Sequence, residues 1–251
     1  MKKITTWFML FILLISLFVM PTGAQAYTRD NLLILMYHKL SENPNEWSDW
    51  CTSPQNFEND VIYLKERGYV FMTAGEIANN PPDPNQKTAV LTFDDGYMSD
   101  YVYALPILKR HNARATFFVL GSRVNYYDYL TTDALKALSA SPNAEIGNHS
   151  MYLHLNHRFT IRRLHNQSTP LYSFRDFTKN KTYLESIIGK PVTSLSYPNG
   201  LYSATLEKML REQGIANITF STGLEPYTFP TSGIIGRLNR SHTVDITQIA
   251  K

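Results

Sequence analysis

The sequence has 251 residues, a formal net charge of +3 and a single cysteine, Cys51. A net charge this small gives no case for a nucleic-acid-binding protein. One cysteine excludes an intrachain disulfide, and we expect Cys51 to be a packed thiol rather than a reactive one.

The N-terminal segment has the features of a secretory signal peptide. Lys2 and Lys3 precede an apolar run over residues 7–20, and the small-residue pattern Ala-Gln-Ala ends at Ala26. A membrane anchor is the alternative, but the run is shorter than the roughly 20 apolar residues that span a bilayer. We therefore expect residues 1–26 to be removed.

Removal of the signal peptide takes both lysines with it, so the net charge falls to about +1. Residues 27–251 have the length of one barrel or sandwich domain with a full core. We expect a monomeric bacterial protein, secreted or associated with the cell wall. No stable membrane anchor is expected, because no cysteine near the cleavage position could carry a lipid.

Short apolar runs alternate with helical patterns along residues 27–251, which is typical of an α/β fold with a parallel sheet. The strands are expected at 32–37, 88–93, 115–120, 145–148, 194–197, 218–221 and 234–238. The helices are expected at 54–67 after a Ser53 cap, 103–111, 132–140, 174–188 and 204–213.

Polar side chains follow several of these strands at the point where each strand ends. Asp94 and Asp95 come after strand 88–93, His149 after strand 145–148, and Tyr197 at the end of strand 194–197. Parallel barrels place their sites on the loops at this end of the strands. One carboxylate can hold a metal while its neighbour moves a proton, as metal-assisted hydrolysis requires.

The same residues have ordinary interpretations. Asp-Asp-Gly is common in solvated turns, and a single loop histidine is more often hydrogen-bonded than a ligand. The spacing of five between His149 and His154 does not place both on one helical face, so a metal would need an irregular loop. The residues alone leave metal binding and a structural role both open.

Taken together, these motifs resemble the polysaccharide deacetylase family, carbohydrate esterase family 4, which shares the NodB homology domain. Thr92–Gly96 matches the family's first motif in full. Leu35–His38, the Ser53-Pro54-x-x-Phe57 pattern and the His149-to-His154 spacing are most similar to an exported subgroup that deacetylates β-1,6-linked poly-N-acetylglucosamine.

The resemblance implies a distorted (β/α) barrel in which Asp95, His149 and His154 hold one divalent metal, most often zinc. Two imidazoles and one carboxylate suit zinc and leave positions for water and substrate. The resemblance also makes Asp94 the general base that takes a proton from water.

The chain departs from the family in its third motif, Arg-x-Pro-Tyr, which here is Ser196-Tyr197-Pro198-Asn199. The backbone amide expected to stabilise the oxyanion is then that of Asn199. Ser196 stands where the family has an arginine that orients the catalytic aspartate, and Arg237 is a hypothetical replacement. We group Tyr197, Asn199 and Arg237 as the substrate-binding candidates.

A second departure concerns the general acid. The family's late Leu-x-His motif, whose histidine protonates the leaving amine, appears as Leu238-Asn239-Arg240. His38 or His242 could supply the proton instead, and both could equally be structural. We favour His38 because it ends the first strand on the expected active rim.

Aromatic residues leave a weaker indication of sugar binding. Trp47 and Trp50 lie in a polar loop after the first strand, and a tyrosine cluster includes Tyr126, Tyr127 and Tyr129. Such rings stack on the apolar faces of sugars, or they pack against the barrel.

We therefore expect an exported metal-dependent hydrolase that removes acetyl groups from an N-acetylated polysaccharide such as poly-N-acetylglucosamine, peptidoglycan or chitin. Alternatives are an O-acetyl esterase on xylan or wall sugars, and a silent glycan-binding barrel suggested by the altered motifs. An Fe(II) oxygenase shares the two-histidine, one-carboxylate ligand set. Export and the adjacent second aspartate argue against it.

Overall fold

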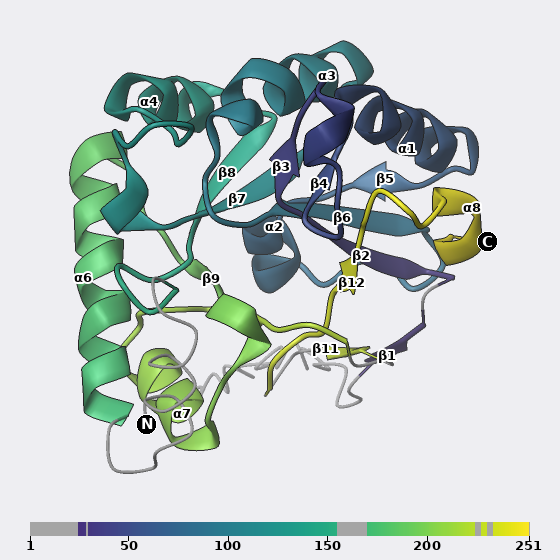
Figure 1. Cartoon of the computed structure of the whole chain (residues 1–251). Coiled ribbons are helices and arrows are strands. Elements are labelled where there is room, and N and C mark those ends of the chain that lie inside the picture. The colour runs from purple at the N-terminus through teal and green to yellow at the C-terminus, as the bar shows by residue number, and fades with distance from the viewer. Residues whose placement is uncertain (1–24, 29, 155–169, 224–226, 230–232, 251) are drawn as a thin grey trace, which may run out of the picture.

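A curled parallel sheet with helices around it organises the chain (Figure 1). The computed structural model describes residues 25–28, 30–154, 170–223, 227–229 and 233–250. Within these residues the strand order is β10-β9-β8-β7-β6-β2-β12, every neighbouring pair is parallel, and β5 also pairs with β6. These strands are β2 (Leu32–Tyr37), β5 (Val70–Phe71), β6 (Thr88–Phe93), β7 (Ala115–Val119), β8 (Ala144–Asn148), β9 (Ser194–Ser196), β10 (Ile218–Phe220) and β12 (Leu238–Asn239).

Helices follow most of these strands. The α-helices are α1 (Pro54–Glu66), α2 (Ala74–Asn79), α3 (Leu105–His111), α4 (Thr132–Ala140), α6 (Pro170–Ile188), α7 (Ala204–Glu212) and α8 (Ile246–Ile249). Two small pairs of strands lie outside the main sheet: β1 (Gln25–Tyr27) with β11 (Tyr227–Phe229), and β3 (Lys39–Leu40) with β4 (Cys51–Thr52).

Several elements form where local sequence signals are strongest. β2 and β6 have the predicted bounds, and α4 begins after Thr131, whose side chain accepts a hydrogen bond from the Ala134 amide. α1 begins after Ser53, which caps the Asn56 amide in the same way, with Pro54 in the first turn. The helix expected at 103–111 differs, because a π-helical turn precedes α3.

The strands separate two cores. All six residues of β2 are buried, since both faces of the sheet are covered. Leu33 and Leu35 belong to the core beneath α1, α3, α4 and α6. Leu32 and Ile34 lie in the core inside the barrel, which also contains Phe220. Cys51 is also buried, as expected, and burial raises the pKa of its thiol.

The segment after residue 233 joins the two edges of the sheet. Ile235 pairs with Phe220 of β10, and β12 then pairs with β2 at the opposite edge. The prediction of a continuous strand at 234–238 is therefore wrong, because the segment changes partner strands within a few residues. This change of partner curls the sheet into the expected distorted (β/α) barrel.

Residues 1–24, which include most of the predicted signal peptide, lie outside the described residues. No helix in the described part of the chain combines the length and apolar character needed to cross a membrane.

Candidate metal centre and catalytic cavity

The carboxyl ends of β6, β8 and β9 bring the predicted motifs together. Asp95, His149 and His154 each offer one ligand atom, and these atoms lie within 4.8 Å of one another. The Nε2 atoms of His149 and His154 lie 3.5 and 3.6 Å from the same oxygen, Oδ1 of Asp95. This places the two histidines around one carboxylate despite their spacing of five.

The donor set fits a divalent metal. Asp95 Oδ1 is buried and has no hydrogen-bond partner among the described residues. The Nδ1 atom of His149 lies 2.9 Å from the Ser196 carbonyl oxygen, so this nitrogen donates and Nε2 keeps its lone pair. Burial lowers the pKa of His149 against the opposing charges of Asp94 and Asp95, which favours the neutral imidazole that a metal requires.

Asp94 has a different environment from its neighbour. The Arg237 guanidinium forms a fork of two parallel hydrogen bonds to Asp94: Nη1 donates to Oδ1 and Nη2 to Oδ2, both at 2.7 Å. Ser196 accepts from Arg237 Nη2 at 2.7 Å and donates to Asp94 Oδ2 at 3.1 Å. Burial opposes ionisation, but the charge and hydrogen bonds of Arg237, together with the neighbouring histidines, outweigh it and hold the pKa of Asp94 well below its usual range. Arg237 thus contacts Asp94 as an arginine that replaces the one missing at Ser196 would have to do.

A cavity of about 570 Å³ opens over these groups, within the size range of ligand sites. Its lining includes Asp94, Asp95, His149, His154, Tyr197, Asn199, Arg237, His38 and Trp50. All the predicted site residues therefore border one space.

His38 lies on this cavity, where its ring and that of Trp50 form a T-shaped pair at a centroid distance of 4.8 Å. Burial lowers the pKa of His38, although the charges of Asp94 and Asp95 partly offset this. His242 is not among the lining residues and instead contacts the Trp47 ring at 4.6 Å.

The third motif forms one wall of the cavity. The Tyr197 hydroxyl donates to Glu207 at 2.7 Å, so the ring and backbone are what Tyr197 offers to a substrate. Asn199 has a left-handed backbone with φ of 56°, which bends the chain beside the cavity.

The tryptophans and tyrosines of the rim differ in exposure. Trp50 is 57% exposed, and Tyr127 is 98% exposed. Tyr129 stacks on Tyr97, which lines the cavity, at a centroid distance of 4.9 Å.

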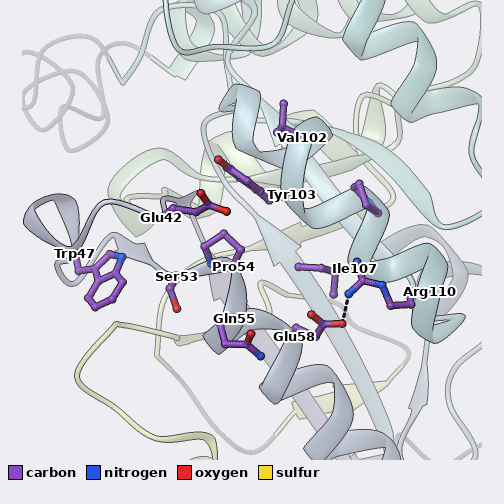
Figure 2. Close-up of a pocket in the computed structure, with 11 residues that line it drawn as sticks. Glu42, Trp47, Ser53, Pro54, Gln55, Glu58, Val102, Tyr103, Ile107 and Arg110 are labelled. Atoms are coloured by element: carbon purple, nitrogen blue, oxygen red, sulfur yellow. Dashed lines mark hydrogen bonds and ion pairs between the residues drawn. The ribbon is translucent and has the colours of Figure 1, made fainter.

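A second cavity of about 460 Å³ lies between α1, α3 and the loop after β3 (Figure 2). Trp47 and Glu42 border it, and an ion pair joins Glu58 to Arg110 at its edge. None of the candidate metal ligands lines this cavity, so it is separate from the candidate metal centre.

Two groups that shape the site were not predicted from the sequence. Ser196 stands where the family has an arginine, and its hydroxyl bridges Arg237 and Asp94. Asp176 on α6 accepts hydrogen bonds from the loop between the two histidines. Its sequence signal is a polar residue on the buried stripe of a helix that also includes Phe177 and Leu184.

The sequence model of the family described as polysaccharide deacetylase matches residues 82–218, more than half of the chain. This chain belongs to the polysaccharide deacetylase family. The matched residues include both aspartates, both histidines and the third motif, but neither His38 nor Arg237.

Named relatives within the polysaccharide deacetylase family differ in substrate. A peptidoglycan-N-acetylglucosamine deacetylase of Bacillus cereus is 28% identical over 177 residues, covering 70% of this chain and 72% of that protein. A poly-beta-1,6-N-acetyl-D-glucosamine N-deacetylase of Staphylococcus epidermidis is 22% identical over 208 residues, covering 75% and 72%. YxkH of Bacillus subtilis, which carries the family name, is 27% identical over 187 residues, covering 73% of this chain but only 62% of YxkH.

A solved structure supports the barrel. The structure of IcaB from Ammonifex degensii superposes with a TM-score of 0.74 at 23% identity, covering 84% of this chain and 92% of that one. The expected NodB-type (β/α) barrel is therefore confirmed.

Proposed function

We propose that this family member is an exported, metal-dependent hydrolase that removes acetyl groups from an N-acetylated polysaccharide. The observation that carries the proposal is the convergence of Asp95, His149 and His154 beside a separately held Asp94. Three ligands leave room for water and substrate on one metal, and the fourth residue remains available for proton transfer.

Asp95, His149 and His154 would hold one divalent metal, for which zinc is the best match to this ligand set. When bound, the metal would supply Lewis acidity that makes water a stronger acid and polarises the acetyl carbonyl. The three ligands come from two loops whose ends are fixed by β6 and β8.

Asp94 is the proposed general base. The Arg237 fork fixes the direction of its carboxylate but also makes it a weak base, because it stabilises the ionised form. Asp94 can therefore accept a proton efficiently only from water that is itself acidic. Its role as a base thus depends on the metal that the neighbouring ligands would hold.

The wall formed by Tyr197 and Asn199 is proposed to bind the acetyl end of the substrate. The left-handed Asn199 lies at a sharp turn on the cavity, and its N–H is the proposed donor to the oxyanion. Arg237 borders the same cavity, but its guanidinium N–H groups donate hydrogen bonds to Asp94, Ser196 and Thr92. Its main proposed role is therefore to position Asp94.

His38 is the proposed proton donor to the leaving amine. Its position on the cavity supports the assignment, whereas Arg240, which stands at the family's histidine position, turns away to form an ion pair with Asp60. Because burial favours the neutral imidazole, His38 must gain a proton before it can donate one. The proton that Asp94 takes from water is one that His38 can gain within the same cavity.

The proposed substrate class is a polymer of N-acetylated amino sugars. The exposed Trp50 beside His38 offers a flat face for a pyranose ring. The named relatives act on peptidoglycan and on poly-N-acetylglucosamine. We further propose that residues 27–251 act as a secreted or wall-associated monomeric domain after removal of residues 1–26.

Acetate release tests this proposal. The purified chain would be assayed on poly-N-acetylglucosamine, chitin oligomers, peptidoglycan and acetylated xylan, with and without chelator. We expect chelator-sensitive release from at least one N-acetylated polymer. Release from xylan alone would instead support an O-acetyl esterase, and no release with glycan binding retained would support a silent barrel.

The variant Asp94→Asn separates catalysis from metal binding. We expect it to retain bound metal, measured by elemental analysis, while acetate release falls about 100-fold or more. His149→Ala should lose both metal and activity, and Asp133→Asn on the exposed first turn of α4 is the matched control. Full activity in Asp94→Asn would show that the base is assigned wrongly.

A further inference from the structure

The loop that joins the two candidate metal ligands has hydrogen bonds to every backbone N–H from His149 to Leu153. The His149 amide donates to the Val119 carbonyl oxygen at 3.2 Å. The Ser150 amide donates to Asn148 Oδ1 at 2.9 Å, and the Leu153 amide to Ser150 Oγ at 3.2 Å. These contacts are local, within the loop or with the adjacent strand.

The two remaining amides point to a distant helix. Met151 donates to Oδ1 of Asp176 at 2.8 Å, and Tyr152 donates to Oδ2 of the same carboxylate at 3.0 Å. Asp176 lies on α6 and is 6% exposed. Hydrogen bonds from N–H groups to a charged acceptor are stronger than those to a neutral acceptor. Here both oxygens of the Asp176 carboxylate accept such a bond.

A second side chain on the same face of α6 supports the base of the loop. Asn180, four residues after Asp176, donates through Nδ2 to the Val119 carbonyl oxygen at 2.9 Å and to Asn148 Oδ1 at 2.8 Å. Asn148 in turn donates to the Phe177 carbonyl oxygen at 2.9 Å.

The Asn180 side chain packs directly against Gly121. A β-carbon at this position would lie 2.1 Å from Asn180 Oδ1, closer than any contact allows. The Gly121 amide also donates to the Ser150 carbonyl oxygen at 3.3 Å. Gly121 thus lies between the Asn180 side chain of α6 and the backbone of the histidine loop.

The loop needs such support because its conformation is unfavourable on its own. Ser150 has a φ of 78°, and this left-handed conformation is unfavourable for a residue other than glycine. The spacing of five also gives no helical turn that would align the histidines. Even so, both Nε2 atoms lie about equally far from Asp95 Oδ1.

We propose that Asp176 is a positioning residue that holds the His149–His154 loop in its metal-binding conformation before the metal arrives. The inference rests on the metal site of the proposed function. Without the carboxylate, metal binding would have to order the amides of Met151 and Tyr152 itself, and loss of such an outer contact lowers metal affinity about 10–100-fold.

The test is the zinc affinity of the metal-free full chain, measured by competition with a chromophoric chelator. Asp176→Asn replaces one acceptor oxygen by an NH₂ group that faces a backbone donor. We expect zinc affinity to fall about 10–100-fold, with a cooperative melting curve showing that the variant is folded. Asp133→Asn is the matched exposed control and should bind zinc as the parent chain does.

Asp176→Glu is the second variant, and it covers the case in which Asp176→Asn does not fold. It keeps the charge but displaces the oxygens by one methylene, so its affinity should fall between those of Asp176→Asn and the parent. A folded variant of either kind with parental zinc affinity overturns the proposal, even if its melting temperature is lower. Failure of the parent chain to bind zinc would instead count against the proposed function.

Discussion

The adjacent aspartates Asp94 and Asp95 differ because of their partners and their backbone. Successive residues in a strand point to opposite faces, but Asp95 has a φ of 77°, which turns its side chain back toward the cavity. Arg237 and Ser196 hold Asp94 with three hydrogen bonds, whereas Oδ1 of Asp95 has no hydrogen-bond partner within the described residues. One carboxylate is thus fixed, and the other is available as a ligand.

Arg237→Lys tests the importance of the fork. Lysine keeps the positive charge but cannot give two parallel bonds to Asp94. We expect the rate of acetate release to fall about 10–100-fold while zinc affinity stays near that of the parent chain, because the metal ligands are untouched. Parental turnover in a folded Arg237→Lys variant would contradict a positioning role.

A pair of histidine variants tests the proton donor. His38→Ala should lower acetate release about 100-fold with metal content unchanged. His242→Ala is the matched control, since this histidine contacts Trp47 and does not line the cavity. The reverse pattern, with His242 essential and His38 dispensable, would move the role to His242.

At the scale of elements, the segment after β12 is held by a buried ion pair. Arg240 donates through Nε to Asp60 Oδ2 at 2.7 Å and through Nη2 to Oδ1 at 2.9 Å. Tyr37 donates to the same carboxylate at 2.9 Å. These contacts attach the C-terminal segment to α1 and β2, so Arg240 has a structural role in this chain.

Arg240→Met should therefore destabilise the fold rather than alter chemistry directly. It leaves the buried Asp60 without its ionic partner, which typically lowers the free energy of unfolding by about 3–5 kcal/mol. Denaturant titration followed by circular dichroism measures the change. Arg175→Met on the exposed side of α6 is the control and should stay within about 0.5 kcal/mol of the parent. Equal stability of both variants would rule out the anchoring role.

At the scale of the whole molecule, the site exists only when the barrel is closed. Its residues extend from His38, directly after β2, to Arg237 in the segment that joins the sheet edges. The ligands therefore converge in the folded chain and separate in the unfolded one. Metal binding and folding are consequently linked.

Zinc should raise the melting temperature of the metal-free chain. At a free zinc concentration about 100 times the dissociation constant, linkage gives about 2.7 kcal/mol. For a chain of this size that corresponds to a rise of roughly 5–10 °C. Differential scanning fluorimetry measures it, and His149→Ala should abolish the rise. An equal rise in His149→Ala would show that zinc stabilises the protein elsewhere.

The parts of the fold that were predicted correctly have local causes. β2 and β6 are continuous apolar runs because both of their faces are buried, and α1 and α4 begin at residues that cap their own first turn. The two-residue strands β3, β4, β5 and β12 were not placed correctly. They form by pairing with neighbouring strands, and two residues are too few to show a hydrophobic period.

The sequence by itself determined the family, the class of fold and the identity of the candidate ligands, since these follow from residue types and spacings along the chain. Only the tertiary structure decided which arginine meets Asp94, which histidine borders the cavity, and how Asp176 supports a loop 24 or more residues away. Such choices depend on distances through space, which the closure of the barrel sets and which no local pattern encodes.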